Sequence, residues 1–544
     1  MKRITFFRTM LLVYLIMVGI LSSYGQFSAG NLVVEQIGDG TTALSGSSTT
    51  VKLLQFTPTG TPGTSTSFFS SAGTPTTSPY NIVESGSATS NGYISLSTDK
   101  AFVVVPGYNA PNATASIAAS ASATYGRTIG KVTSTGALQT NGTFNALTGN
   151  NYRSIVSNGS SYWLGGGIGI VYTPTDVTSG ITTTCTSIIT TNTRILNIFN
   201  NTLFASTSST SFNGTGSNLG IYQIGSTFNA LPTATVTATT NVNIINTATG
   251  SSPYAFAFSP DGLTCYVADD RSTTAGGVQK WIYSGTFSAS TGWSGGTWTL
   301  SYTLGTGATN IGARGLTVDF SGTNPVIYGT SAEGSLNRVF SITDTGSAST
   351  ATTLATATAN YIFRGICFAP QAIPTISVVE SYVPNMAVDV NSRTINVSGS
   401  NLTGDITLAI SGTNAVQFDV TPKTLTQTAG VVASTPVTIS YSNNGSNSDA
   451  AILTLSSSGA TSKTFNLVGG ITTGMSQVFS TLSVSASDGV IHFTAVAGKM
   501  VELYNAVGQK LLIKQTVDGM NSIPISTKGL VVLKVGNQIA KVVL

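Results

Sequence analysis

Arginine residues recur at one place in a repeated pattern, and their side chains are the best suited in this sequence to binding chemistry. Each arginine comes at the start of an apolar, strand-like segment, and a tyrosine and a glycine take the same place in two further segments: Arg153, Arg194, Arg314 and Arg364, with Tyr254 and Gly92. Guanidinium groups bind carboxylates and phosphates through paired hydrogen bonds. If the segments converge, the arginines would surround an anion site for an acidic sugar or a phosphate. The alternative is that each arginine caps carbonyl groups or pairs with a neighbouring acid.

Side chains for acid–base or metal chemistry are scarce. The single histidine, His492, lies in an alternating segment near the C-terminus and is interpreted as a solvent-facing strand residue. A Ser-His-Asp hydrolase or a histidine zinc site is therefore not expected. Asp269 and Asp270 are adjacent and could form part of a calcium site, because calcium prefers several oxygen ligands. A solvated loop end is the simpler interpretation. We predict no catalytic residue and, calcium apart, no cofactor.

Tryptophan side chains form a second candidate surface. Trp281 and Trp293 lie in a Gly- and Ser-rich region, close to Tyr283 and Trp298. Exposed rings of this kind could stack on the faces of sugars. The alternation around Trp281 also suits packing between neighbouring sheets, which is the favoured interpretation.

The composition indicates a β protein with many turns. Only 8% of the 544 residues are charged and the net charge is +4, which argues against a nucleic-acid partner because phosphate binding needs a clustered basic surface. Gly, Thr and Val recur at short intervals, as is typical of strands and turns. The three cysteines, Cys185, Cys265 and Cys367, lie far apart in the sequence; Cys265 and Cys367 fall in apolar strand patterns and are interpreted as buried thiols, with a Cys265–Cys367 bridge as the alternative.

An internal repeat organises residues 26–370. Each unit reads strand, glycine turn, strand, and the units begin near 92, 153, 194, 254, 314 and 364. Their spacing of about 40 to 60 residues predicts the blades of a β-propeller. The last unit stops after one strand, so we expect N-terminal strands near Asn31 and Val51 to complete its blade. This predicts six blades, or seven if residues 81–92 or 206–225 hide a degenerate unit. The units resemble those of extracellular propellers of the NHL and lactonase-like families.

Residues 371–474 differ from the preceding repeats in the length and alternation of their apolar segments. Pro370 and Pro374 end the repeats, since proline cannot join a strand ladder. Longer alternating segments follow and predict a β-sandwich. This region resembles the immunoglobulin-like modules of secreted Bacteroidetes proteins. The segment Gly469–Gly474 is expected to be a flexible joint to the last domain.

The last domain, residues 475–544, carries a recognisable pattern. An apolar segment runs into a Tyr-Asn pair and a Gly-Gln pair, followed later by a glycine and a basic final segment: Leu503, Tyr504, Asn505, Gly508 and Gln509, then Gly529 and Lys541. This pattern resembles the type A-like C-terminal sorting domain of the type IX secretion system of Bacteroidetes. The resemblance implies a partner in the secretion machinery and transport across the outer membrane. The alternative is a small β-sandwich without a signal role.

The N-terminus supports export independently. Lys2, Arg3 and Arg8 precede an apolar run from Met10 to Ile20 and a small-residue exit, which together indicate a signal peptide over residues 1–25. No later segment reaches the roughly 20 apolar residues of a membrane span. After cleavage we expect no transmembrane segment, and passage through the periplasm to the outer surface or the medium.

These features predict a surface-attached or released binding and adhesion protein, with a glycan or protein ligand on the propeller. Two alternatives stay open. One is an extracellular polysaccharide hydrolase or lyase, and the other is a structural surface-layer or filament subunit. Since no catalytic constellation is found, an enzyme is not the favoured interpretation.

Overall fold

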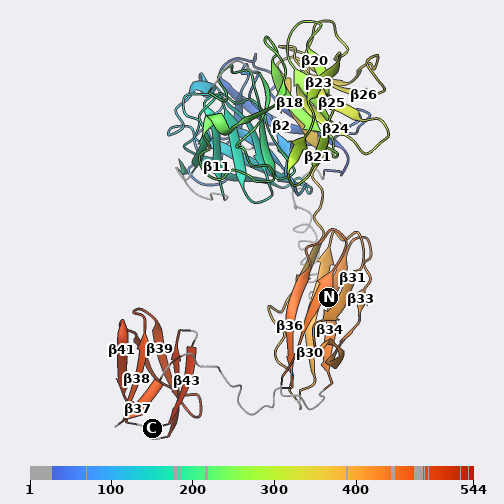
Figure 1. Ribbon diagram of the computed structural model, residues 1–544. Coiled ribbons are helices and arrows are strands. Elements are labelled where there is room, and N and C mark those ends of the chain that lie inside the picture. Colours follow the sequence, from blue (N-terminus) through green and yellow to red (C-terminus); the bar gives the residue numbers. More distant parts are fainter. Residues whose placement is uncertain are drawn as a thin grey trace, which may run out of the picture. The chain divides into compact units, whose positions relative to one another are not determined.

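The computed structural model describes most of the chain beyond the N-terminal segment, and it is all-β, as expected (Figure 1). The described residues are 27–68, 70–174, 181–182, 185–214, 219–387, 390–442, 448–470, 482, 484–487, 489–526, 529–536 and 538–543. The predicted signal peptide, and the predicted joint after Gly470, lie outside them. Two compact units are present, Met1–Ile373 and Pro374–Leu544. Three single-turn 3-10 helices interrupt the strands: η1 (Ile117–Ala119), η2 (Ala238–Thr240) and η3 (Ala415–Gln417).

The described residues of the first unit form six four-stranded antiparallel groups. Four groups are separate sheets: β9 (Tyr152–Ser157), β10 (Tyr162–Gly166), β11 (Gly169–Thr173) and β13 (Thr186–Ile189); β14 (Leu196–Phe199), β15 (Thr202–Thr207), β16 (Gly220–Gln223) and β17 (Val242–Asn246); β18 (Pro253–Phe258), β19 (Thr264–Asp269), β20 (Gly277–Tyr283) and β23 (Trp298–Leu304); β24 (Ala313–Asp319), β25 (Val326–Ser331), β26 (Arg338–Thr343) and β27 (Thr352–Thr356). A small hairpin, β21 (Thr286–Ser288) with β22 (Gly292–Ser294), precedes β23.

The other two groups join into one ten-stranded sheet. One group contains β5 (Ser95–Leu96), β6 (Phe102–Tyr108), β7 (Arg127–Thr133) and β8 (Leu138–Phe144), and the other contains β28 (Ile362–Phe368), β1 (Leu32–Ile37), β2 (Ser48–Phe56) and β3 (Pro62–Ser67). The short strand β4 (Val83–Ser85) bridges β2 and β6, and β12 (Ile181–Thr182) adds in parallel to β8.

The last repeat is completed from the N-terminal end of the unit. Strand β28 pairs antiparallel with β1, with Val34 opposite Ile366 and Ile37 opposite Ile362. Strand β1 is almost entirely buried because it lies between β28 and β2, and its near-continuous apolar sequence suits that central position. The missing partners of the truncated repeat therefore come from residues far away in the sequence.

The second unit contains two pairs of sheets. The first pair is β29 (Thr375–Val378), β30 (Ser392–Ser400), β34 (Val432–Tyr441) and β32 (Phe418–Thr421), with β33 (Thr424–Leu425), β31 (Ile406–Ser411), β35 (Asp449–Ser456) and β36 (Lys463–Gly469). Alternate residues of these strands share one apolar core, which includes Ile395, Val437 and Leu453. Alternation of this kind is what a strand with one buried face requires.

The C-terminal pair of sheets has its own core. It consists of β37 (Val484–Ser487), β38 (Val490–Ala495) and β41 (Gly519–Pro524), with β40 (Lys510–Gln515), β39 (Met500–Asn505), β42 (Leu530–Val535) and β43 (Gln538–Val543). Ile491, Leu503 and Leu533 are among the buried residues of this core.

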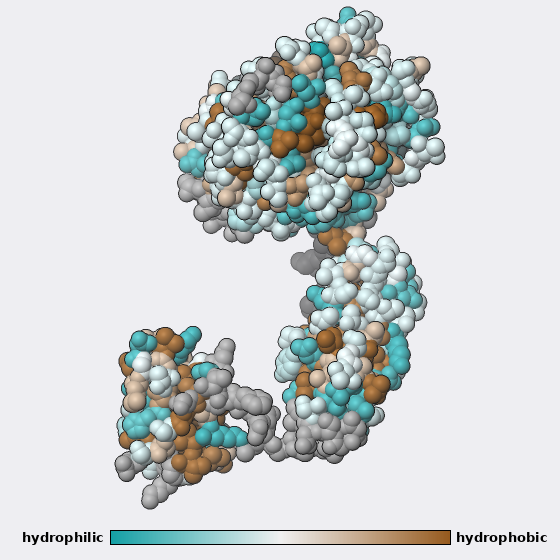
Figure 2. Space-filling model, viewed as in Figure 1, coloured by the Kyte–Doolittle hydropathy of each residue, from teal (hydrophilic) through white to brown (hydrophobic). Residues whose placement is uncertain are grey.

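The outer surface reflects the low content of charged residues. Much of the visible face of the first unit is of intermediate hydropathy, as expected where Ser, Thr and Gly face solvent, whereas the C-terminal sheets show several apolar patches (Figure 2). Exposed apolar side chains of those sheets and their loops include Val507, Ile513 and Met520.

We predict that replacing Val34 by Asp destabilises the first unit by at least about 3 kcal/mol, because it buries a charge between β28 and β2. Urea unfolding of the full chain, followed by tryptophan fluorescence, measures this unit alone, since all four tryptophans lie in it. The control is Val242→Asp at a position that is 41% exposed. Equal midpoints for the two variants would contradict the role given to β1.

Candidate functional site

The four repeat arginines lie close to the starts of the first strands of their repeat units, where neighbouring groups hold them. The first strands of the six units are β5, β9, β14, β18, β24 and β28. Arg153 donates from Nη1 to Asn192 Oδ1 (2.5 Å) and to the Thr193 carbonyl (2.8 Å). Arg194 donates from Nη1 to Ser252 Oγ (2.8 Å) and to the Pro253 carbonyl (3.2 Å). Each of these two arginines therefore reaches the segment that leads into the next sheet, and so ties neighbouring sheets together.

Two tyrosines lie among the arginines. The Arg194 guanidinium lies 4.3 Å from the centroid of the Tyr254 ring, and that of Arg314 lies 5.9 Å from it. The Tyr93 ring is 5.7 Å from the Tyr254 ring, centroid to centroid. Cations over aromatic faces are attracted by the ring quadrupole. The structure therefore brings Arg194 and Arg314 together around Tyr254.

The other two arginines, Arg153 and Arg364, lie close enough to Arg194 and Arg314 for those charges to lower their pKa values. Burial, and then the charge of nearby Arg194, lower the pKa of Arg153 to about 10. Burial lowers the pKa of Arg364, and the charge of Arg314 lowers it further. We call Arg153, Arg194, Arg314 and Arg364 the arginine ring.

The arginine ring has more buried donors than acceptors. Arg364 is only 1% exposed and donates from Nη2 to the Gly86 carbonyl (3.3 Å), while its Nε and Nη1 are buried without a hydrogen-bond partner. Arg314 Nη1 and Arg153 Nε are also buried and unpaired. Among the described residues, one carboxylate forms an ion pair with the ring, Asp270 with Arg314 Nε (3.0 Å). An unpaired buried donor costs roughly 1–3 kcal/mol, so these donors favour an added acceptor.

Two buried glutamates interact electrostatically with Arg364. Glu35 of β1 and Glu84 of β4 are fully buried, and burial raises the pKa of Glu84 to about 8. Burial, followed by the nearby charge of Glu84, raises the pKa of Glu35 well above its usual value. A side chain at Gly92 would place its Cβ 2.3 Å from Glu35 Oε2, so the repeat position taken by arginine elsewhere must be glycine here.

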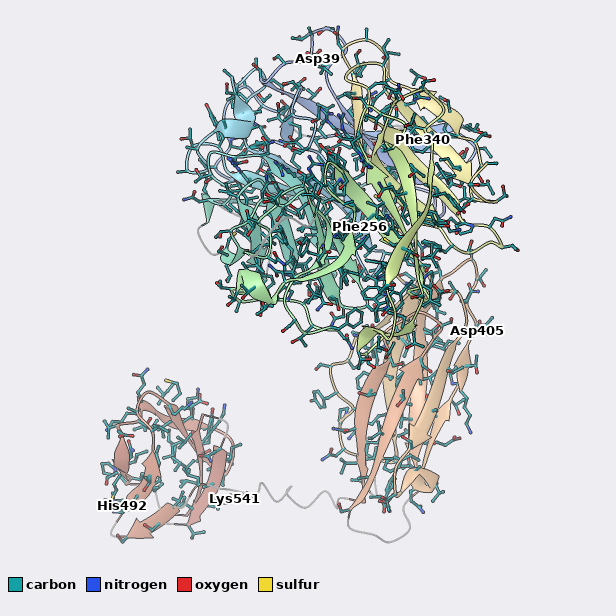
Figure 3. All side chains as sticks on the ribbon, turned by 45° about the horizontal axis from the view of Figure 1, so that its top comes forward. Asp39, Phe256, Phe340, Asp405, His492 and Lys541 are labelled. Atoms are coloured by element: carbon teal, nitrogen blue, oxygen red, sulfur yellow. The ribbon has the colours of Figure 1, made fainter. Side chains whose placement is uncertain are left out.

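An uncharged cavity runs along the same first strands. Its volume is ≈ 200 Å³, and residues of β5, β9, β14, β18, β24 and β28, or of the segments beside them, all line it. Phe256 of β18, labelled in Figure 3, is one of the apolar lining residues, and Asn197 and Thr317 are among the polar ones. Tyr93 of the arginine site also borders this cavity. Residues in or beside all six of these strands therefore border one cavity.

Of the two candidate tryptophans, Trp281 is buried in the first unit and Trp293 is half-buried against the same apolar cluster. Trp281 is 7% exposed and donates from Nε1 to Gln279 Oε1 (3.0 Å). Trp293 donates from Nε1 to the Gly262 carbonyl (2.6 Å), and its ring lies 5.1 Å from that of Phe258 and 5.2 Å from that of Phe287. These contacts fix both indoles in a packed aromatic cluster, away from the arginine ring.

Asp269 and Asp270 serve different arginines. Asp269 is buried, pairs with Arg271 (2.8 Å) and accepts a hydrogen bond from the Ser252 amide (3.2 Å), whereas Asp270 pairs with Arg314. Adjacent residues of a strand point to opposite sides, which explains the divergence. In the described part of the chain, no three His, Cys, Asp or Glu side chains come together as metal ligands.

The residues of the sorting motif build a hairpin between β39 and β40. The Gly508 amide donates to the Asn505 carbonyl (3.0 Å), and Asn505 Oδ1 accepts from the Gln509 amide (2.9 Å). Gly508 has φ +83°, a conformation that side chains disfavour. Leu503 is buried in the core, and the Lys510 ammonium lies 5.6 Å from the Tyr504 ring centroid.

The other motif residues lie further along the same sheet. Gly529 precedes β42 with φ +114°, and Lys541 lies exposed on β43 (Figure 3). His492 of β38 places Nδ1 2.9 Å from Ser522 Oγ on the neighbouring strand.

All three cysteines are free thiols, so the Cys265–Cys367 bridge is not formed. Burial raises the pKa of Cys185 to about 12 and that of Cys265 well above its usual value. Thiols with raised pKa are poor nucleophiles, because the thiolate is the reactive form.

No family model matches the sequence, and no curated protein matches it. Solved structures with some similarity include the CupB2 chaperone of Pseudomonas aeruginosa, with 15% identity, 31% of this chain and 100% of that chain covered, and a TM-score of 0.17. The extracellular domain of BT4673 from B. thetaiotaomicron has 12% identity, 81% and 58% coverage, and a TM-score of 0.32. Dimeric latent PorU from Porphyromonas gingivalis has 10% identity, 54% and 33% coverage, and a TM-score of 0.12. The chain thus spans less than two thirds of the latter two.

No helix in the described residues has the length and apolar character needed to cross a membrane.

The buried glutamates predict a pH-dependent stability. The folded chain holds the Glu84 proton up to a pH of about 8, whereas a glutamate of unperturbed pKa, 4.5, loses it earlier. The free energy of unfolding therefore falls as the pH rises from about 5 to about 8, by roughly 1.4 kcal/mol per unit of pKa difference, and levels off above it.

Urea midpoints of the full chain, read by tryptophan fluorescence at each pH, measure this slope. Glu84→Gln is expected to reduce it, and Glu35→Gln with Glu84→Gln to reduce it further, while Glu380→Gln, at a half-buried position of the second unit, leaves it in place. An unchanged slope in the double variant would show that these carboxyls are not the cause.

Proposed function

We propose that the protein is a secreted or surface-attached binding protein whose first unit is a six-bladed β-propeller. Support comes from the six four-stranded groups, whose first strands all border one cavity, and from the closure of the last group by β1. Six blades are favoured over seven, because residues 81–92 and 206–225 contribute β4 and β16 to groups already counted.

The ligand that we propose for the propeller is a small anionic group, such as the carboxylate of an acidic sugar or a phosphate. The observation that carries this proposal is the set of four buried, unpaired donors on Arg153, Arg314 and Arg364, with one ion-paired carboxylate beside them. Hydrogen bonds from guanidinium to an anion are short and about twice as strong as neutral ones. A binding role without catalysis suits the surroundings, since Asp270 is held by Arg314 and the two glutamates are buried.

The second unit supports the export part of the proposal. We propose an immunoglobulin-like spacer over residues 371–474 and a type IX sorting domain over residues 475–544. The two-sheet pairs of this unit suit both assignments, and Asn505 and Gly508 form the hairpin that gives the motif its spacing. The partner would be the secretion machinery, and exposed side chains such as Ile513 and Met520 offer apolar contact area.

Anion binding is tested by calorimetry on the full chain with sodium glucuronate and with glucose, its neutral counterpart. Glucuronate is expected to bind and glucose is not. Arg364→Met, and Arg314→Met combined with Asp270→Asn so that no charge is stranded, should each weaken glucuronate binding at least about tenfold, which is roughly 1.4 kcal/mol.

The control variant is Arg393→Met, which removes one positive charge from the second unit. Melting temperatures are recorded for all variants. Glucuronate that fails to bind the wild type, or ring variants that lose stability while binding normally, would refute the anion site.

Export is tested by deleting residues 478–544 in a host with a working type IX system. The shortened protein is expected to stay in the periplasm, because it lacks the segment that resembles the sorting domain. Immunoblots of periplasm, cell surface and medium measure its distribution, and Gly508→Val in the full chain, at φ +83°, tests the hairpin alone. Intact shortened protein in the medium would refute the sorting role.

A further inference from the structure

Glu35 and Glu84 are buried without a salt-bridge partner in the described structure. Both are 0% exposed, and neither takes part in an ion pair there. Glu84 Oε2 accepts from Asn91 Nδ2 (3.1 Å) and from the Ser85 amide (3.2 Å), while Glu84 Oε1 and both oxygens of Glu35 have no hydrogen bond. A buried carboxylate in this state is expensive, so each group gains by staying protonated or by acquiring a cationic neighbour.

Several strands place titratable groups around these glutamates. The groups that act on the charge of Glu35 or Glu84, or are acted on by it, are Arg364 and Cys367 of β28, Arg127 of β7, Tyr108 of β6 and Tyr152 of β9. Arg127 is mostly engaged elsewhere: it donates to the carbonyls of Tyr125, Ser120, Leu147 and Asn150, its guanidinium lies 4.9 Å from the Tyr108 ring, and its Nε alone is buried and unpaired.

Arg364 has more unpaired hydrogen-bond donors than Arg127. It makes one hydrogen bond, to the Gly86 carbonyl, and its Nε and Nη1 are unpaired. Its positive charge can therefore stabilise either of two negative groups. One is the anion proposed at the arginine ring, and the other is an ionised buried glutamate.

We propose that Glu84, together with the nearby Glu35, is a positioning residue that makes anion binding at the arginine ring depend on pH. This inference rests on the proposed function. While both carboxyls are protonated and neutral, the charge of Arg364 is available to the ligand. Once Glu84 loses its proton, its negative charge draws on the same guanidinium and repels the anion.

The protonation states follow from burial. The pKa of Glu84 is raised to about 8 and that of Glu35 is raised strongly, so Glu84 changes charge in mildly alkaline solution. Coupling between two binding equilibria is reciprocal: if ionised Glu84 weakens anion binding, a bound anion must raise the pKa of Glu84 by the same factor. Anion binding near pH 8 should then take up protons from the solvent.

The first experiment measures sulfate binding to the full chain at pH values of about 6.5 and 9. Sulfate keeps the same charge throughout this range, and Arg153, with a pKa of about 10, stays mostly protonated. Affinity is expected to fall at least about fivefold between the two pH values. In Glu84→Gln, whose amide can still accept from Asn91 and Ser85, the profile should be flat, whereas Glu380→Gln should retain the fall.

The second experiment needs no variant and decides the matter if Glu84→Gln does not fold. Calorimetric titration with sulfate at pH 8, in two buffers with different ionisation enthalpies, gives the number of protons taken up on binding. Uptake of a fraction of one proton supports the inference. Binding with equal affinity at both pH values and without proton uptake would overturn it, whereas an absence of sulfate binding at every pH would overturn the proposed function itself.

Discussion

The antiparallel pairing of β1 with β28 is the interaction on which the first unit depends. Without it, β28 would be a single strand, and both β28 and β1 would present open edges. The same pairing creates the arginine site, because it places Glu35 of β1 within the electrostatic reach of Arg364 of β28. The Gly365 amide also donates to the Gly92 carbonyl (2.9 Å), which joins β28 to the segment before β5. The strand pairing that completes the last group therefore also brings the groups of the arginine site together.

The few charged residues fall into two kinds. Asp344 represents the first: it is buried, pairs with Lys280 (2.8 Å), and accepts from the hydroxyls of Tyr302 (2.7 Å) and Tyr266. Because these partners satisfy both carboxylate oxygens, a structural role accounts for Asp344. Arg364, Glu35 and Glu84 represent the second kind, since they are equally buried but leave donors and acceptors unpaired. Unmet polar groups of this type are uncommon in folded proteins and often mark sites that a ligand or water completes.

The repeat could be predicted from the sequence because its signals are local. Apolar strands and glycine turns located the six first strands to within a few residues, and the truncated last unit pointed to β1. The buried glutamates could not be predicted, since Glu35 and Glu84 meet Arg364 only through pairing between distant segments. The one local sign was Gly92, which takes the place of an arginine where Glu35 enters. Alternation around Trp281 suited either packing or exposure, and the neighbours that bury it come from other strands. The adjacency of Asp269 and Asp270 suggested a shared metal, but strand geometry sends them to different arginines.

The position of β1 also has a consequence for the timing of folding. Because β1 pairs with β28, the first unit cannot be completed until residues 32–37 and 362–368 are both free to pair. Contacts between distant segments form slowly, and until then the apolar strand β1 has free edges that could pair with another chain. A chain in which β28 has not yet paired should accordingly associate with other copies more readily than the completed fold.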